Sequence, residues 1–319
     1  MPTELHLADG SPATADADAV VIGLLPAANG EQAPRLAPGA SEVAQAFGGE
    51  DELVDLLTVV GATGKADEVV KLPTRGATTA PLLVAAGLGA PDEGGEPHAE
   101  QVRRASGSAA RALAGSARAV STLGRIDLAA AAEGTLLGAY AFTEYRSNGN
   151  GKDPVGRVGL VADGDRSDVL RTATAVATAV RTARDLVNTP PNDLYPETFA
   201  ARARELAEAA GVEVEVLDDA ALADGGYGGV LGVGGGSARK PRLVKLTYVP
   251  EGVESPTKVA LVGKGITFDT GGISIKPAAG MWEMKSDMAG AAAVGATMLA
   301  VAALKPGVAV TGYLAMAEN

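Results

Sequence analysis

Four charged residues in an otherwise apolar and glycine-rich stretch have the types and spacing of a catalytic or metal-binding site. Lys264 and Asp269 follow the apolar run at residues 259–262, and Lys276 and Asp287 come soon after them. We expect the apolar run to be a core strand, so that Lys264 and Asp269 lie where this strand ends. Ligands of open α/β sheets bind beyond the carboxyl ends of strands. Buried Lys and Asp are costly unless they are paired or bind a metal ion.

The alternative is that these charges form ordinary surface ion pairs. That alternative suits Glu283 and Lys285, which lie in the same stretch. It suits the other four residues poorly, because glycines at positions 263, 265, 271 and 272 surround them and permit close backbone approach. Asp287 also precedes an apolar helix start, where an acid is a favourable capping residue.

The chain restricts the kind of metal that such a site can hold. It has no cysteine, and its two histidines, His6 and His98, have no partner at metal-ligand spacing. A metal ion would therefore use oxygen ligands or a lysine nitrogen. Such a set suits Mn²⁺ or Mg²⁺, or a catalytic Zn²⁺ in an oxygen-rich site.

A glycine-rich stretch at residues 225–236 invites comparison with a phosphate-binding loop. It contains no Gly-x-Gly-x-x-Gly spacing, and Gly263-Lys264 lacks the preceding glycine of a P-loop. Nucleotide binding is therefore disfavoured, and we expect tight turns and close packing at residues 225–236.

The elements that position these residues alternate between strands and helices, which predicts an α/β protein with a mixed or parallel sheet. Apolar or alternating runs predict strands at residues 19–25, 82–86, 155–161, 211–217, 242–249, 259–262 and 308–316. Helical periodicity predicts helices at residues 41–60 with a break at Gly48-Gly49, and at 99–114, 129–145, 169–187, 196–210 and 290–304.

The length of 319 residues suits two domains. We place the boundary near residue 164, with residues 1–164 as an N-terminal α/β domain. Residues 165–319 would form a linker helix and the first part of a catalytic α/β domain.

The charge and hydropathy of the chain bear on its partners and location. The net charge of −12 disfavours nucleic acid. No basic and apolar leader is visible at the N-terminus, and no uncharged apolar run reaches the roughly 20 residues of a membrane span. We therefore expect a cytoplasmic protein with no membrane contact.

Three motifs around the charged residues resemble the leucyl aminopeptidase family, the cytosolic di-metal exopeptidases. They read GKGITFD at 263–269, GGISIKP at 271–277 and MKSDMAGA at 284–291. The segments 185–192, 231–243 and 133–140 are also similar to the family. The resemblance runs almost continuously from about residue 130 to residue 319, and the N-terminal part has diverged.

The resemblance implies a role for each matching residue. Lys264 would bind one metal ion through its nitrogen, Asp269 would bridge two ions, and Asp287 would be a further ligand of the ion that Lys264 holds. Lys276 would be the catalytic lysine that binds the scissile carbonyl oxygen. Met284 would line the pocket for the first side chain of the substrate.

The resemblance also implies cofactors and partners. It predicts two divalent metal ions, Mn²⁺ or Zn²⁺, and a bicarbonate that acts as general base. The substrates would be peptides, with leucine and similar N-terminal residues preferred, and the protein would be a homohexamer. A non-catalytic DNA-binding or regulatory role, known within the family, is the alternative, and the acidic charge argues against DNA.

The chain departs from the family pattern in three places. The family continues beyond the strand at 308–316 into two more metal carboxylates and a catalytic arginine, none of which this chain contains. We therefore expect an incomplete stretch of a longer protein, inactive alone and with an open sheet edge at this strand. Thr270 stands where serine is common, and Trp282 where an acid is common.

Overall fold

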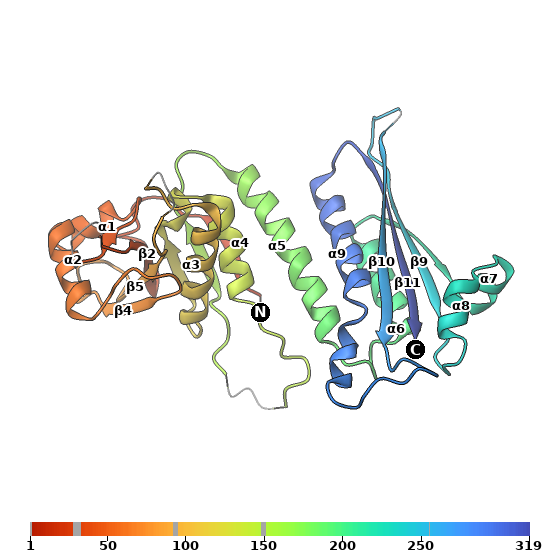
Figure 1. Ribbon diagram of the computed structural model, residues 1–319. Helices are drawn as coiled ribbons and strands as arrows, with labels where there is room; N and C mark the ends of the chain where they lie inside the picture. The colour runs from red at the N-terminus through yellow and green to blue at the C-terminus, as the bar shows by residue number, and fades with distance from the viewer. Residues whose placement is uncertain (1, 28–32, 92–94, 148–150, 255) are drawn as a thin grey trace. The chain divides into compact units, whose positions relative to one another are not determined.

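The structure, a computed structural model, describes residues 2–27, 33–91, 95–147, 151–254 and 256–319. It divides into two compact units, Met1–Ala177 and Thr178–Asn319. Each unit combines helices with a sheet (Figure 1), so the predicted α/β class is confirmed. The division by contacts falls inside the long helix α5 (Ser167–Asn188). The domain boundary near residue 164 remains a prediction.

The first unit contains a 7-stranded sheet in the order β1-β7-β6-β2-β5-β4, with β3 beside β2. Its inner pairs are parallel, and β4 and β3 pair antiparallel with β5 and β2. The strands are β1 (Glu4–Leu7), β2 (Ala19–Leu25), β3 (Arg35–Leu36), β4 (Val69–Pro73), β5 (Leu82–Gly87), β6 (Arg118–Ser121) and β7 (Arg157–Leu160). The helices are α1 (Ser41–Ala46), α2 (Glu50–Val59), α3 (Ala99–Ala112), η1 (Thr122–Arg125) and α4 (Leu128–Gly138).

Strand β2 is buried at every position, because helices cover both faces of the sheet. Its odd-numbered residues, including Val21, pack into the core that α3 and α4 share. Its even-numbered residues, including Ile22 and Leu24, pack into a second core with α1 and α2. A fully apolar strand is typical of such a doubly covered sheet.

Helices α3 and α4 pack so closely that glycine is required at their contact. A Cβ added to Gly134 would lie 2.1 Å from the carbonyl oxygen of Arg103, and one added to Gly138 would lie 2.4 Å from that of Gly107. The glycine at 134 therefore sets the distance between the two helices.

The second unit contains a 4-stranded sheet in the order β10-β11-β9-β8. β10 and β11 are parallel, and the other two pairs are antiparallel. The strands are β8 (Glu213–Leu217), β9 (Arg242–Tyr248), β10 (Lys258–Phe268) and β11 (Ala309–Glu318). The helices are α6 (Pro196–Ala209), α7 (Asp219–Asp224), α8 (Gly228–Gly234), η2 (Met281–Ser286) and α9 (Ala289–Leu304).

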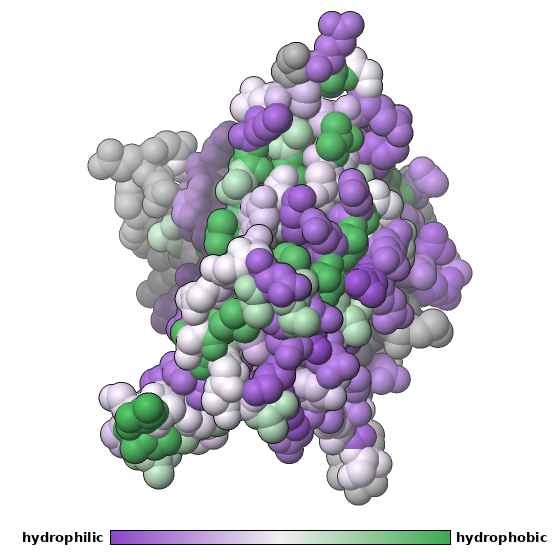
Figure 2. Space-filling model, turned by 90° about the vertical axis from the view of Figure 1, so that its right-hand side faces the viewer, coloured by the Kyte–Doolittle hydropathy of each residue, from purple (hydrophilic) through white to green (hydrophobic). Residues whose placement is uncertain are grey.

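Helices α6 and α9 pack against the sheet and against each other, and they form the core of this unit. On the opposite face, cross-strand neighbours include Tyr313, Lys245 and Glu215, which are half-buried or exposed. Figure 2 looks onto the α7 and α8 side and shows apolar areas scattered among hydrophilic ones. The sheet of the second unit is therefore well covered on one face.

Three local expectations are wrong. Strand β11 lies between β10 and β9, so it is central as expected but is not the open edge. The edge is β10, and its apolar run at 259–262 is largely exposed, with Val262 at 74%. Residues 228–234 of the glycine-rich stretch form α8, where we expected turns.

Among the described residues, Met281–Leu304 is the one segment long and apolar enough to cross a membrane by composition. Core helices of globular proteins pass the same test. Its helix α9 packs on β10 and β11, with Ala291, Ala292, Ala296 and Met298 buried. This helix therefore contributes part of the core of the second unit.

Candidate metal and catalytic site

The four charged residues come from β10 and from the segment that joins it to α9. Lys264 lies within β10, and Asp269 follows the last residue of that strand. The chain then turns through Gly271 and Gly272, whose φ angles of +90° and +60° favour glycine, before it reaches Lys276. Asp287 follows η2.

The first pair joins Lys264 to Asp287. The Lys264 Nζ atom lies 2.6 Å from Asp287 Oδ2. The Asp287 side chain is 22% exposed, whereas that of Lys264 is 60% exposed. The expectation of a buried Lys264 is therefore wrong, because β10 is an edge strand. The helix-capping alternative for Asp287 also fails, because Met288 occupies the N-cap of α9.

The second pair joins Lys276 to Asp269 through Lys276 Nζ and Asp269 Oδ2. The other carboxylate oxygen of Asp269 accepts hydrogen bonds from the Gly271 backbone N–H at 3.0 Å and from Asn319 Nδ2 at 2.9 Å. The hydrogen bond from Lys276 lowers the pKa of Asp269, and the bonds from Gly271 and Asn319 add to this effect against the opposing effect of burial. Asp269 is therefore a carboxylate at neutral pH.

Asn319 is a residue of this site that the sequence analysis missed. Besides its bond to Asp269, its carbonyl oxygen accepts hydrogen bonds from Thr270 N at 2.6 Å and Thr270 Oγ1 at 2.9 Å. The signal that could have found it is strand pairing, since β10 and β11 are parallel and Phe268 pairs with Glu318. Asp269 and Asn319 directly follow these two paired residues and are therefore neighbours.

A polar network extends from the end of β11 to the segment after α5. Glu318 accepts a hydrogen bond from Ser237 at 2.6 Å and forms an ion pair with Arg239 at 3.4 Å. Arg239 also donates to the carbonyl oxygen of Pro191 at 2.9 Å, and its guanidinium lies 4.3 Å from the ring centroid of Tyr195. These contacts connect the two motifs at 185–192 and 231–243 to the end of β11, directly before Asn319.

The remaining predicted residue, Met284, lies half-buried in η2. Lys285 donates to the carbonyl oxygen of Asn188 at 3.3 Å, which fits its expected structural role. Trp282 is exposed, as are Ile273 and Ile275 in the turn between Asp269 and Lys276.

The residues fit part of a metal shell. Asp287 Oδ2 is buried, and its partner among the described residues is Lys264 Nζ, which lies 2.6 Å away in an ion pair that does not meet hydrogen-bond geometry. A carboxylate oxygen beside a side-chain nitrogen is a suitable donor pair for a divalent ion. Among the described residues, no group of three or more His, Asp or Glu side chains is placed to hold a metal. The described part of the chain therefore offers three candidate ligands, the Lys264 nitrogen and the carboxylates of Asp269 and Asp287, with Asp269 paired to Lys276 and Asp287 paired to Lys264.

Comparison with known proteins identifies the family. Residues 181–319 match the catalytic domain of the cytosol aminopeptidase family, and residues 21–149 match its N-terminal domain. The chain is 53% identical over 317 residues to a probable cytosol aminopeptidase of Nocardia farcinica, covering 95% of this chain and 60% of the relative. It is 48% identical over 338 residues to a protein of the same name from Streptomyces griseus, covering 99% and 64%. The chain belongs to the cytosol aminopeptidase family.

Solved structures agree. The bottromycin maturation enzyme BotP in complex with Mn is 33% identical, with a TM-score of 0.77 over 95% of this chain and 60% of that one. A mutant of tomato leucine aminopeptidase shares the fold, with a TM-score of 0.80 at 22% identity, covering 100% of this chain and 63% of that one. The chain thus spans about 60% of the length of the first relatives that it matches.

Proposed function

We propose that the protein is a metal-dependent aminopeptidase that releases N-terminal residues, leucine and similar ones preferred, from peptides. The observation that carries this proposal is the pair of contacts Lys264–Asp287 and Lys276–Asp269 in a chain of this family. The manganese complex of BotP supports the use of divalent ions. The names of the relatives support a cytoplasmic location.

Each of the four residues has a role in this proposal. Lys264 and Asp287 would hold one divalent ion, and Asp269 would bridge it to a second. When bound, two such ions supply an activated water and polarise a carbonyl group. A lysine that binds a metal must give up its proton, and a neighbouring dication favours the deprotonated amine.

Lys276 would act on the substrate. Its ammonium group is fixed by the ionised Asp269 in this structure. A positive charge placed at the scissile carbonyl oxygen stabilises the negative charge that develops there. The half-buried Lys276 side chain can turn from Asp269 toward the substrate, since Asp269 keeps its bonds from Gly271 and Asn319. Met284 would contact the first side chain of the peptide.

The test compares two substitutions in the full-length protein. Asp269→Ala should abolish both metal binding and hydrolysis of leucine anilides, because the bridging ligand is removed. Lys276→Ala should keep the metal content and lower kcat by about 10²–10³-fold, the usual cost of one oxyanion stabiliser. Full activity of Asp269→Ala would refute the proposal, and loss of metal in Lys276→Ala would show that Lys276 is a ligand.

Family membership also leads us to propose a homohexamer, with bicarbonate as a further bound group. Analytical ultracentrifugation of the full-length protein tests the assembly. A monomer at micromolar concentration would contradict it. Activity after metal removal and reconstitution with Mn²⁺, Zn²⁺ or Mg²⁺ identifies the ion.

A further inference from the structure

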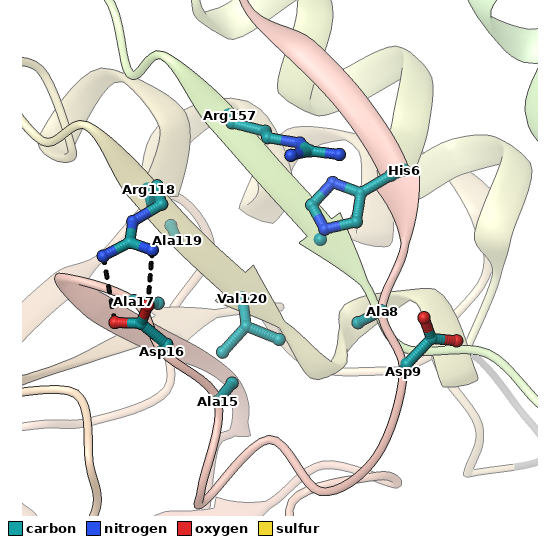
Figure 3. A pocket seen from close by; sticks show the side chains of 11 residues that line it. His6, Ala8, Asp9, Ala15, Asp16, Ala17, Arg118, Ala119, Val120 and Arg157 are labelled. Carbon is teal, nitrogen blue, oxygen red and sulfur yellow. Dashed lines mark hydrogen bonds and ion pairs between the residues drawn. The ribbon is translucent and has the colours of Figure 1, made fainter.

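A cavity of about 300 Å³ lies on the sheet of the first unit, over strands β1, β6 and β7. None of the residues of the proposed catalytic site lines it. Its side chains come from these strands and from the segment at residues 8–17 (Figure 3). The volume is at the lower end of the range for small-molecule sites, so a small ligand fits it best.

The cavity exists because the middle strand has a glycine at its centre. Gly159 on β7 is in register with His6 on β1 and with Val120 on β6. A Cβ added to Gly159 would lie 3.0 Å from His6 Nε2. The missing side chain at Gly159 therefore leaves a hollow between β1 and β6. The His6 imidazole can lie over the backbone of Gly159, which forms the floor of this hollow.

An arginine without a partner borders this hollow. Arg157 lines the cavity, and its guanidinium forms no hydrogen bond or ion pair with the described residues, whereas its backbone N–H donates to the carbonyl oxygen of Ala117. Arg118, which is in register with Arg157 on the neighbouring strand β6, does have a partner. Asp16 accepts two hydrogen bonds from its guanidinium, at 2.6 Å and 2.9 Å. Figure 3 shows the Arg118–Asp16 pair on one side of the cavity and Arg157 beside His6 on the other. The planar donors of Arg157 thus remain available for an oxyanion.

His6 provides a second unsatisfied group. Its Nδ1 atom is buried and has no hydrogen-bond partner among the described residues. Burial lowers the pKa of His6, the charge of Arg157 lowers it further, and Asp9 partly opposes both. The other charged groups nearby are Glu4, which is in register with Arg157, and the paired Arg118 and Asp16. His6 is therefore neutral at pH 7 in the empty cavity.

We propose that this cavity binds a small oxyanion, a carboxylate or a phosphate, through the Arg157 guanidinium, with His6 as a second, protonated donor. An anion beside Arg157 offsets the positive charge that disfavours the imidazolium. Binding is then accompanied by uptake of a proton from solvent at His6. The affinity should rise as the pH falls toward the ordinary pKa of histidine, about 6.5.

The test uses the whole chain and NMR of its two histidines, which His98→Gln assigns unambiguously. Inorganic phosphate and succinate are titrated separately, with chloride at matched ionic strength as the reference. We expect either anion to shift the His6 signals and to raise its pKa, and His98 to stay unchanged. The arm that binds more tightly identifies the source of the oxyanion. Unmoved His6 signals with both anions would overturn the proposal.

Two variants separate a specific site from general charge attraction. Arg157→Gln should weaken anion binding by about ten- to a hundredfold, the loss expected for a hydrogen bond to a charged group. Arg171→Gln removes an exposed arginine of α5 and should leave the affinity unchanged. Equal affinities of these two variants would refute the site.

Gly159→Ala tests the floor of the cavity. Because the added methyl group meets the His6 ring, it should abolish the anion-dependent shift of His6. The amide spectrum confirms that the variant is folded. Unchanged anion binding in this folded variant would contradict the location.

Discussion

In the first unit, strand β2 is buried at all seven positions, whereas in the second unit strand β10 exposes Val262 to 74%. Both strands contain an apolar run, at residues 19–25 and 259–262, and both have a parallel neighbour. They differ in their surroundings, because β2 has a strand on each side and helical cores on both faces, while β10 is an edge. An apolar run thus indicates a strand, but its place in the sheet decides its burial.

The comparison also explains where polar residues are tolerated. Each unit has lysine or arginine side chains near strand ends, but Lys264 lies on the exposed edge strand, where desolvation is small. A charged residue in the middle of β2 would have no solvent and no partner. Among the described residues, the proposed metal ligand Lys264 therefore has solvent beside it, which a residue of β2 would not have.

The largest expected effect comes from truncating one side chain in each of these strands. Leu24→Ala should lower the free energy of unfolding by about 2–5 kcal/mol, because a fully buried leucine leaves a cavity. Val262→Ala should change it by no more than about 0.5 kcal/mol, as is usual for exposed positions. Urea unfolding of both variants measures the difference. A cost for Val262→Ala equal to that of Leu24→Ala would show that β10 is covered in solution.

A smaller effect separates two glycines in helices. Gly134→Ala should destabilise the first unit by about 1–3 kcal/mol, because the new methyl group meets the backbone of Arg103. Gly295→Ala in α9 should stabilise the second unit by about 0.5–1 kcal/mol, because the nearest atom is 3.6 Å away and alanine favours a helix. Thermal unfolding of each variant is the measurement. A stabilising Gly134→Ala would mean that α3 and α4 are farther apart than in this structure.

The sequence predicted much of this architecture, for identifiable reasons. Strand β2, the break between α1 and α2 at Gly48-Gly49, and helices α5 and α9 all have clear periodicity or breaker residues, and they lie close to the expected ranges. Short strands such as β6 at Arg118–Ser121 were missed, because four residues carry little periodicity. Helix α8 was missed because it is rich in glycine, which has a low helix propensity.

The candidate site, like the fold, was predicted only in part from the sequence. The spacing of Lys264, Asp269, Lys276 and Asp287 singled out these four residues as candidates, and the structure brings them together in two pairs. The exposure of Lys264 and the bond from Asn319 to Asp269 could not be read from spacing, because both depend on which strands are neighbours.

A substitution of Asn319 should have an effect of intermediate size on the metal affinity of the proposed site. Asn319→Ala removes the 2.9 Å hydrogen bond to Asp269 Oδ1 and should weaken metal binding by about tenfold, as loss of a supporting hydrogen bond does. Ser286→Ala is the control, since Ser286 bonds to the Glu283 carbonyl oxygen within η2. Isothermal titration of the metal into each full-length variant compares them. Equal affinity in the Asn319 and Ser286 variants would show that Asp269 is positioned without Asn319.

The smallest effect is a pH dependence in the first unit. The Ser11 hydroxyl and then Arg125 lower the pKa of Glu42 below its ordinary 4.5. This carboxylate therefore adds stability that is complete above pH 4.5 and is lost as the pH falls through its lower folded-state pKa.

For this half-exposed pair, Glu42→Gln should cost only about 0.2–1 kcal/mol at pH 7. The difference from the unmodified protein should be smaller at pH 3 than at pH 7, because it is lost as the pH falls below 4.5. Urea unfolding at the two pH values measures it. A difference that grows as the pH falls would have the wrong sign and would exclude this role for Glu42.

The order of the second sheet has a consequence for synthesis on the ribosome. Strands β9 and β10 are consecutive in the chain, yet β11, which is made later, lies between them. The nascent chain therefore cannot complete this sheet by pairing each new strand with the strand synthesised just before it. β10 must wait without its neighbour until β11 has emerged, while the first sheet, which is made earlier, can fold meanwhile. The bond between Asn319 and Asp269 can therefore form only after β11 has paired with β10.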